Sequence, residues 1–143
     1  FFELSGDIYY KNGNFEKAIS EYKKAINANN EKFSPSVDLI KFSLVKSYNQ
    51  TNNKTYYNES IVIIEQLLQN NPKWSYLWRL LAKSANKVNK QGISYIALAE
   101  EALIKKNFIK AKKYVDLANS DPSIPNSYKL RGADILARIK IKK

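Results

Sequence analysis

The spacing of large and small apolar residues at the start of the chain is the feature that most constrains its fold. In residues 2–26 the apolar side chains recur every three or four positions, in two runs separated by an Asn-Gly-Asn segment. This period is typical of a helix with one buried face. Gly and Asn tolerate the left-handed backbone that ends a helix, so residues 12–14 are predicted to reverse the chain. Two helices joined by so short a turn must pack antiparallel.

The same helical period continues along the rest of the sequence. Only four Gly and four Pro occur in 143 residues, too few for a sandwich or barrel with many tight turns. The segment 93–105 is apolar around most of its circumference, which predicts a buried helix. The sequence therefore predicts an all-α fold of about eight helices and no sheet, with further helices at residues 35–49, 57–70, 75–88, 93–105, 108–119 and from 126 onward.

Eight residues of the first two predicted helices follow a regular order of large and small side chains. They are Phe2, Gly6, Tyr9, Gly13, Phe15, Ala18, Tyr22 and Ala25. This order and spacing resembles the tetratricopeptide repeat (TPR) family, whose repeat of about 34 residues places such residues on two antiparallel helices. Asn30 stands where that repeat usually closes with Pro. The resemblance implies a right-handed superhelix of stacked antiparallel helix-turn-helix units, each packed on its neighbours.

We expect one domain over residues 1–143, built from units of unequal regularity. Residues 93–105 either complete the unit that starts at residue 75 or form the first helix of a unit that residues 108–119 complete. The predicted units are 1–30, 35–72 with a long polar turn, an irregular 74–122 with an extra or shifted helix, and a capping helix at 124–143.

Met is absent, including at position 1, so we expect an internal or C-terminal piece of a longer protein. No window approaches the roughly 18 to 20 consecutive apolar residues of a membrane span. Cys is also absent, which excludes disulfides and leaves the redox compartment open. The location is therefore left open between the cytoplasm and the periplasmic side of a bacterial envelope.

The net charge of +11 lies entirely in the second half of this basic chain. Residues 1–72 hold eight Lys and eight acidic residues, whereas residues 73–143 hold sixteen Lys or Arg and five acidic residues. Such asymmetry suggests that one end of the molecule meets an anionic partner, such as nucleic acid or an anionic surface. A solvated lysine-rich surface, produced by codon usage in an AT-rich genome, explains the same numbers.

The residue types argue against catalysis. His is absent, which removes imidazole bases, His metal sites and Ser-His or Cys-His nucleophiles. Glu100 and Glu101 are adjacent, so on a helix they diverge by roughly 100° and do not face each other. The four Gly are isolated, so no glycine-rich loop cradles a phosphate. We expect no enzyme activity, no cofactor and no metal.

Polar residues on the first helix of each predicted unit are the candidate binding residues. The resemblance implies that first helices line a concave groove that contacts a bound peptide. The candidates are Glu3, Asp7, Tyr10 and Lys11, then Phe42, Lys46 and Asn49, then Arg79, Lys83, Asn86 and Lys87. TPR domains that clamp a terminal carboxylate carry Lys and Asn where this chain carries Glu3 and Asp7. A solvated helix face is the alternative.

Two of these candidates, Tyr10 and Phe42, fall off the apolar stripes, as does Trp74. Such aromatic residues either anchor a partner or pack against a neighbouring unit. We therefore expect a protein–protein interaction module or scaffold that binds and stabilises another protein or peptide, and a segment with an acidic stretch is one candidate. The alternative is binding of nucleic acid or an anionic surface by the basic C-terminal half, and salt dependence separates the two because phosphate contacts give a steep slope.

Overall fold

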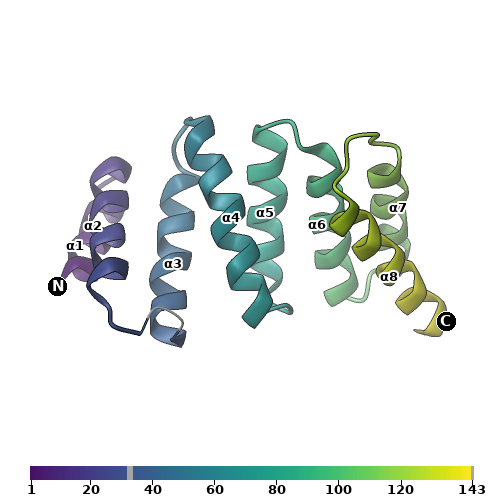
Figure 1. Ribbon diagram of the computed structural model, residues 1–143, viewed down its shortest axis with the longest axis horizontal. Coiled ribbons are helices and arrows are strands. Elements are labelled where there is room, and N and C mark those ends of the chain that lie inside the picture. The colour runs from purple at the N-terminus through teal and green to yellow at the C-terminus, as the bar shows by residue number, and fades with distance from the viewer. Residues whose placement is uncertain (32–33, 143) are drawn as a thin grey trace. The chain divides into compact units, whose positions relative to one another are not determined.

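The computed structural model describes residues 1–31 and 34–142. In these residues every helix that the sequence predicts is present and no strand occurs, which confirms the all-α prediction. Within each part of the chain, most helices that are next to each other in the sequence pack as adjacent pairs. The eight helices of the described residues, labelled in Figure 1, are α1 (Phe2–Lys11), α2 (Phe15–Ala28), α3 (Pro35–Tyr48), α4 (Lys54–Asn70), α5 (Ser75–Lys87), α6 (Gln91–Ile104), α7 (Phe108–Asn119) and α8 (Asn126–Lys142).

The chain divides into two compact units, Phe1–Leu67 and Leu68–Lys143, which we call unit 1 and unit 2. Unit 1 holds α1, α2, α3 and most of α4, and unit 2 holds α5 to α8. The sequence predicts a single domain over residues 1–143 and a right-handed superhelix, and both predictions concern how whole units are arranged. Both stay predictions.

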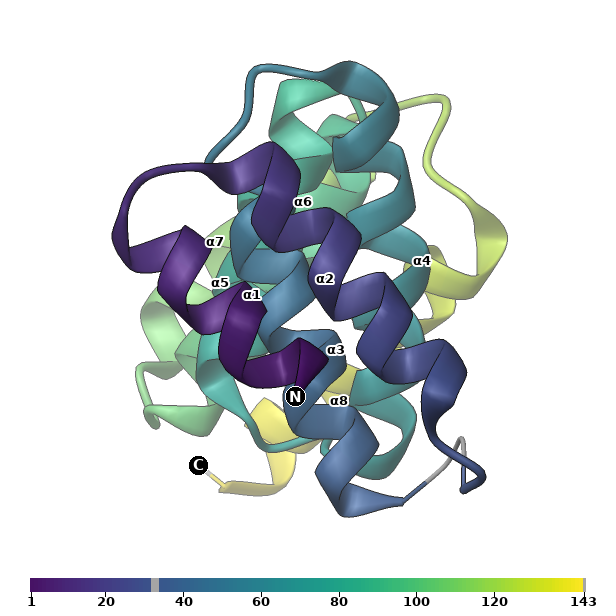
Figure 2. The ribbon, with the colours of Figure 1, turned by 90° about the vertical axis from the view of Figure 1, so that its left-hand side faces the viewer.

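In unit 1 the α1–α2 hairpin forms a close contact around Gly6. A Cβ atom at Gly6 would lie 2.6 Å from the ring of Tyr22, so a larger residue there would displace the ring. Figure 2 shows this hairpin turned toward the viewer. On the predicted stripe of α2, Ala18, Tyr22 and Ala25 are buried and Phe15 is half-buried. The buried cluster also includes three residues of α3; it consists of Ala18, Ile19, Tyr22, Ala25, Ile40, Leu44 and Tyr48.

Three turns share one backbone geometry. Each contains a residue with positive φ: Gly13 at 76°, Asn89 at 60° and Lys106 at 60°. The N–H of that residue bonds a carbonyl three residues back, and the next N–H bonds one five residues back, as Asn14 does to Tyr9 at 2.9 Å. This pair of bonds is the Schellman motif, which satisfies the free carbonyls at a helix end. It joins α1 to α2, α5 to α6, and α6 to α7.

The pairing of α6 has two answers, because α6 packs extensively against both α5 and α7. Toward α5 it behaves as a second helix, since the Ser94 hydroxyl donates to the Ala82 carbonyl at 2.8 Å. Toward α7 it behaves as a first helix, since the α6–α7 turn ends on Asn107, which caps α7 as Asn14 caps α2. Helix α6 is therefore buried around most of its circumference, as predicted, because other helices pack on more than one of its sides.

The α3–α4 connection is shorter than the sequence suggested. The sequence predicts a long polar turn before a helix at residues 57–70, but α4 begins at Lys54. The Asn53 side chain accepts the N–H of Thr55 at 2.8 Å and that of Tyr56 at 3.3 Å. A side-chain oxygen in this position satisfies the first free N–H groups of a helix and so fixes its start.

Candidate functional site

The α1 and α3 helices of unit 1 bring together three of the predicted binding residues. The Lys46 ammonium lies over the Phe42 ring at 5.0 Å from its centroid and over the Tyr10 ring at 5.6 Å. All three side chains are half-buried, and the Tyr10 ring also meets the Phe15 ring edge-on at 5.4 Å. A cation over two aromatic faces is held by electrostatic attraction to both. We call Asp7, Tyr10, Phe42 and Lys46 the α1–α3 patch.

Asp7, the acidic residue of this patch, has a structural partner. The Tyr22 hydroxyl donates to the Asp7 carboxylate at 2.5 Å. Burial, and then this hydrogen bond, raise the pKa of Tyr22 above its ordinary range. The other two predicted residues of α1, Glu3 and Lys11, are exposed to solvent. The chain therefore offers one fixed carboxylate and two solvated charges along α1.

Asn49 does not belong to a binding surface, which corrects the prediction for that residue. Its side chain is only 4% exposed, and its amide donates to the Val45 carbonyl at 3.0 Å. Asn49 directly follows the last residue of α3, and the Val45 carbonyl also accepts its backbone N–H at 3.0 Å. A partner cannot reach a side chain in that position, so we exclude it from the candidate site.

In unit 2, α5 carries the remaining candidates, Arg79, Lys83, Asn86 and Lys87, which we call the α5 face. All four are exposed. Arg79 is paired, since its Nε lies 2.8 Å from Glu101 Oε2, and Asn86 accepts from the Gln91 side chain at 2.9 Å. The Arg79 side chain is 56% exposed whereas that of Glu101 is only 13% exposed, so the guanidinium can be approached from the solvent side of the pair.

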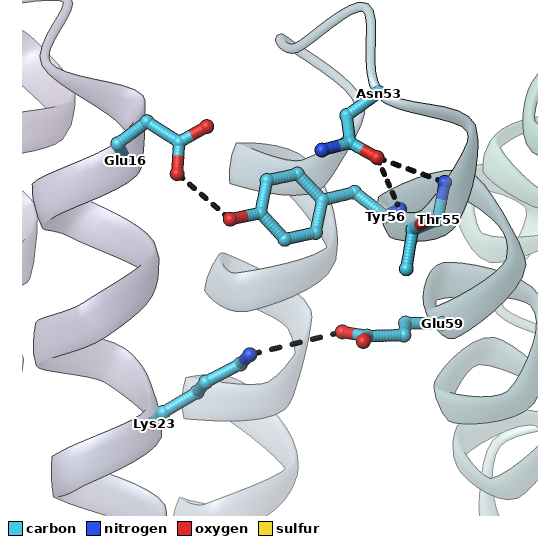
Figure 3. Close-up of polar contacts among 6 residues, drawn as sticks. All are labelled: Glu16, Lys23, Asn53, Thr55, Tyr56 and Glu59. Carbon is cyan, nitrogen blue, oxygen red and sulfur yellow. Dashed lines mark hydrogen bonds and ion pairs between the residues drawn. The ribbon is translucent and has the colours of Figure 1, made fainter.

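A polar network between α2 and α4 was missed by the sequence reasoning. The Tyr56 hydroxyl donates to Glu16 at 2.7 Å, and Lys23 lies 3.8 Å from Glu59, as Figure 3 shows. The hydrogen bond to Glu16 raises the pKa of Tyr56. These partners lie far apart in the sequence, and no helical spacing links them. These contacts join α4 to α2. The ring of Tyr56 also stacks on the ring of Tyr48, with the two centroids 4.9 Å apart.

The adjacent carboxylates of α6 diverge as predicted. Glu100 is buried, with Arg131 Nη1 at 3.4 Å, whereas Glu101 meets Arg79 and Lys105. Burial raises the pKa of Glu100, and the neighbouring Arg131 opposes that shift. The two groups thus serve different partners and do not form an acid–base pair.

Within residues 1–31 and 34–142, no group of three or more acidic residues converges as a metal site would require. Likewise, none of the helices described there combines the length and apolarity needed to cross a membrane.

The described residues form an all-α protein of helix-turn-helix units, joined in part by repeated turns. Its helices α1, α3 and α5 carry polar surfaces. Residues 6–35 match the family model of the TPR repeat. This match begins at Gly6 and includes all of α2, so it confirms the predicted resemblance in the part of the chain where the motif is most complete. No curated protein shows a significant match to the sequence.

A TPR repeat implies, in general, a protein–protein interaction module, and such domains are typically non-catalytic. The coarse prediction of a protein partner is supported at that level.

Proposed function

We propose that this chain is a protein-binding module whose α1–α3 patch contacts an acidic segment of another protein. The observation that carries the proposal is the position of Lys46 over the rings of Tyr10 and Phe42. Lysine is a flexible side chain, and ordering it on binding normally costs free energy. Here two rings already restrict the ammonium group, which lowers that cost.

The chemistry of this patch suits a carboxylate next to an apolar group. The Lys46 ammonium can donate charge-assisted hydrogen bonds, which are stronger than those between neutral groups. The half-buried faces of Tyr10 and Phe42 provide rigid apolar area, and aromatic residues of this kind dominate many protein interfaces. Asp7 at the edge disfavours a second acidic group there, and so favours one orientation of the partner segment.

The α5 face of unit 2 is proposed as a second contact of the same kind. Lys83 and Lys87 lie one turn apart on α5 and are both exposed. Their charge favours an acidic stretch and accelerates its association by electrostatic steering. Each of the two surfaces is proposed by itself, from the residues on its own unit.

The test compares variants in the capture of partner proteins. Immobilised wild-type chain, Lys46→Glu and Phe42→Ser would be exposed in parallel to lysate of the source organism, and bound proteins identified by mass spectrometry. We expect one set of proteins to be retained by wild type and lost from both variants. The matched control is Lys54→Glu, an equal charge change at an exposed position of α4 outside the patch. Retention by all four proteins, or by none, contradicts the proposal.

The exposed cations of residues 73–141 favour a second candidate function, binding of nucleic acid or an anionic surface. Every Lys and Arg in that range is exposed. Phosphate contacts release counterions, so binding to labelled single-stranded DNA would fall steeply between 50 and 200 mM salt, by roughly 10³-fold for six contacts. Tight binding with that slope, unaffected by Lys46→Glu, would favour this candidate over the protein-binding module.

A further inference from the structure

A cleft in unit 2 lies among α6, α7, α8 and the turn before α5. It encloses about 540 Å³, which is in the size range of ligand-binding pockets. Its walls include the apolar side chains of Leu103 and Ile104 on α6, Phe108 on α7 and Ile141 on α8. None of the residues predicted from the sequence as binding residues lines this cleft.

The charged residues of the cleft are strongly unbalanced. Four cations line it, Lys73, Lys106, Arg131 and Arg138, and Glu100 is the one carboxylate among the described lining residues. All four cations are exposed, whereas Glu100 is 8% exposed. Charge at the rim of a concave apolar surface attracts groups of opposite sign and orients them.

The two arginines of the cleft already have partners. The Arg131 guanidinium lies 5.0 Å from the centroid of the Trp78 ring and pairs with Glu100 at 3.4 Å. Arg138 pairs with Asp134 on the same helix at 3.0 Å. A planar guanidinium held by an aromatic face keeps donors available for a second carboxylate, because it carries five N–H groups in a fixed geometry.

We propose that this cleft binds a partner segment that carries an apolar side chain next to a carboxylate. The apolar side chain would occupy the space between Phe108 and Ile141, and the carboxylate would meet Arg131 and Arg138. A continuous peptide fits better than an enclosed small molecule because the rim of the cleft is open: all four of its cations are exposed. The inference rests on the proposed protein-binding function and adds a separate site to it.

The probes are fluorescein-labelled peptides of about ten residues, tested with the full chain by fluorescence anisotropy. An array would vary the spacing between a Leu-Phe pair and two Asp or Glu residues. Two control arrays would replace the acidic residues by Lys, or the Leu-Phe pair by Ser. We expect some peptides of the first array to bind, and their controls to bind about tenfold more weakly. Equal binding by all three arrays, or by none, overturns the proposal.

Three variants give three different expected results. Arg138→Glu should weaken binding of the best peptide about three- to fivefold, as expected for one rim charge. Glu100→Gln removes the carboxylate of the cleft while keeping its shape, and should strengthen binding. Lys129→Glu makes the same charge change as Arg138→Glu on the same helix, outside the cleft lining, and should leave binding unchanged. Circular dichroism would establish that each variant is folded.

Other occupants of the cleft predict other outcomes. If decanoate, an apolar chain with one carboxylate, displaces the peptide at equal concentration, the cleft is a small-molecule site and the proposal falls. If light scattering shows a dimer that Arg138→Glu dissociates, the cleft is filled by a second copy of the chain. If peptide binding is lost in Lys46→Glu but kept in Arg138→Glu, the cleft is excluded while the proposed function stands.

Discussion

The α1–α2 hairpin of unit 1 and the α6–α7 hairpin of unit 2 share one backbone plan. Both turn through a Schellman motif, and both second helices begin with an Asn cap, where the side chains of Asn14 and Asn107 accept an N–H at 3.3 and 3.2 Å. The small residues Ala18 and Ala111 occupy matching places and are fully buried. The same close approach of two helices is therefore built twice in one chain.

The side chains at the centre of that approach differ between the two hairpins. In unit 1 the pair is Gly6 and Tyr22, a residue without a side chain facing a large ring. At the matching positions unit 2 has Ala99 and Val115, both fully buried. A larger group on the first helix thus goes with a smaller one on the second. Interiors are close-packed, so helix spacing is kept by the combined volume rather than by either residue.

The carboxylates that follow these residues also differ. Asp7 comes directly after Gly6 and accepts from the Tyr22 hydroxyl. Glu100 comes directly after Ala99, and Val115 has no hydroxyl to offer, so its partner is Arg131 from α8. The carboxylate is thus bound inside the hairpin in unit 1 and by the next helix in unit 2. Both members of the unit 2 pair, Glu100 and Arg131, line the cleft.

Exchange of the central pair gives the largest expected effect. Tyr22→Val should destabilise the chain by about 3 kcal/mol, since it empties part of the core and removes the partner of Asp7. Gly6→Ala alone should also destabilise it, because the new Cβ meets the ring. In the Tyr22→Val background Gly6→Ala should instead stabilise. Urea unfolding of the four proteins measures this coupling, and strictly additive effects would show that volume exchange is not the rule here.

Tryptophan at the shared small positions is the next test. Ala18→Trp, Ala25→Trp and Ala111→Trp should each cost about 1 to 3 kcal/mol, because overpacking a buried helix contact forces the backbone to shift. Lys17→Trp, at an exposed position of α2, should cost much less. Melting temperatures by circular dichroism provide the comparison. Equal losses at Ala18 and Lys17 would mean that the buried stripe of α2 is wrongly placed.

The turns should respond with opposite signs. Gly13 and Lys106 share positive φ, a conformation that costs a residue with a Cβ roughly 1 to 2 kcal/mol. Gly13→Ala should therefore destabilise the chain by about 1 kcal/mol, and Lys106→Gly should stabilise it by a similar or smaller amount. Asn89→Gly should change stability least, since Asn tolerates this conformation. Chemical denaturation checks the order, and destabilisation by Lys106→Gly would contradict it.

The smallest effects that we expect are two pH dependences of stability, one in the acid to neutral range and one in alkali. Burial raises the pKa of Glu100 above its ordinary value of 4.5, so its contribution to stability is complete below pH 4.5 and is lost as the pH rises through the raised pKa. Wild type should therefore lose stability relative to Glu100→Gln as the pH rises from 4 to 7. Unfolding curves at several pH values test this, and a constant difference would contradict it.

In unit 1 the corresponding carboxylate, Asp7, is bonded to Tyr22, and this tyrosine should respond only in alkali. The pKa of Tyr22 is raised above 10, mainly by burial, so its contribution is present below pH 10 and is lost as the pH rises through the raised pKa. Tyr22→Phe should show a shallower alkaline loss of stability than wild type. Identical alkaline profiles of the two proteins would assign the loss to other groups.

Much of the fold could be predicted because its signals are local. The helices, the Asn-Gly-Asn turn and the buried stripe of α2 each depend on residues within one or two turns of each other. The predicted start of α4 was wrong because residues 50–55 are polar and were read as a loop, whereas the Asn53 side chain caps the helix there. The site was predicted only in part: Lys46 and Tyr10 do meet, but Asn49 turns inward to a helix-end carbonyl.

The sequence by itself determined that this chain forms antiparallel helix pairs, since helical period and turn chemistry act between near neighbours. Only the tertiary structure decided that α6 serves both α5 and α7, that Tyr56 reaches Glu16, and that Glu100 meets Arg131 beside an apolar cleft. Those contacts join residues far apart in the chain. Periodicity assigns a residue to a face of its own helix, and the packing of other helices decides what that face meets.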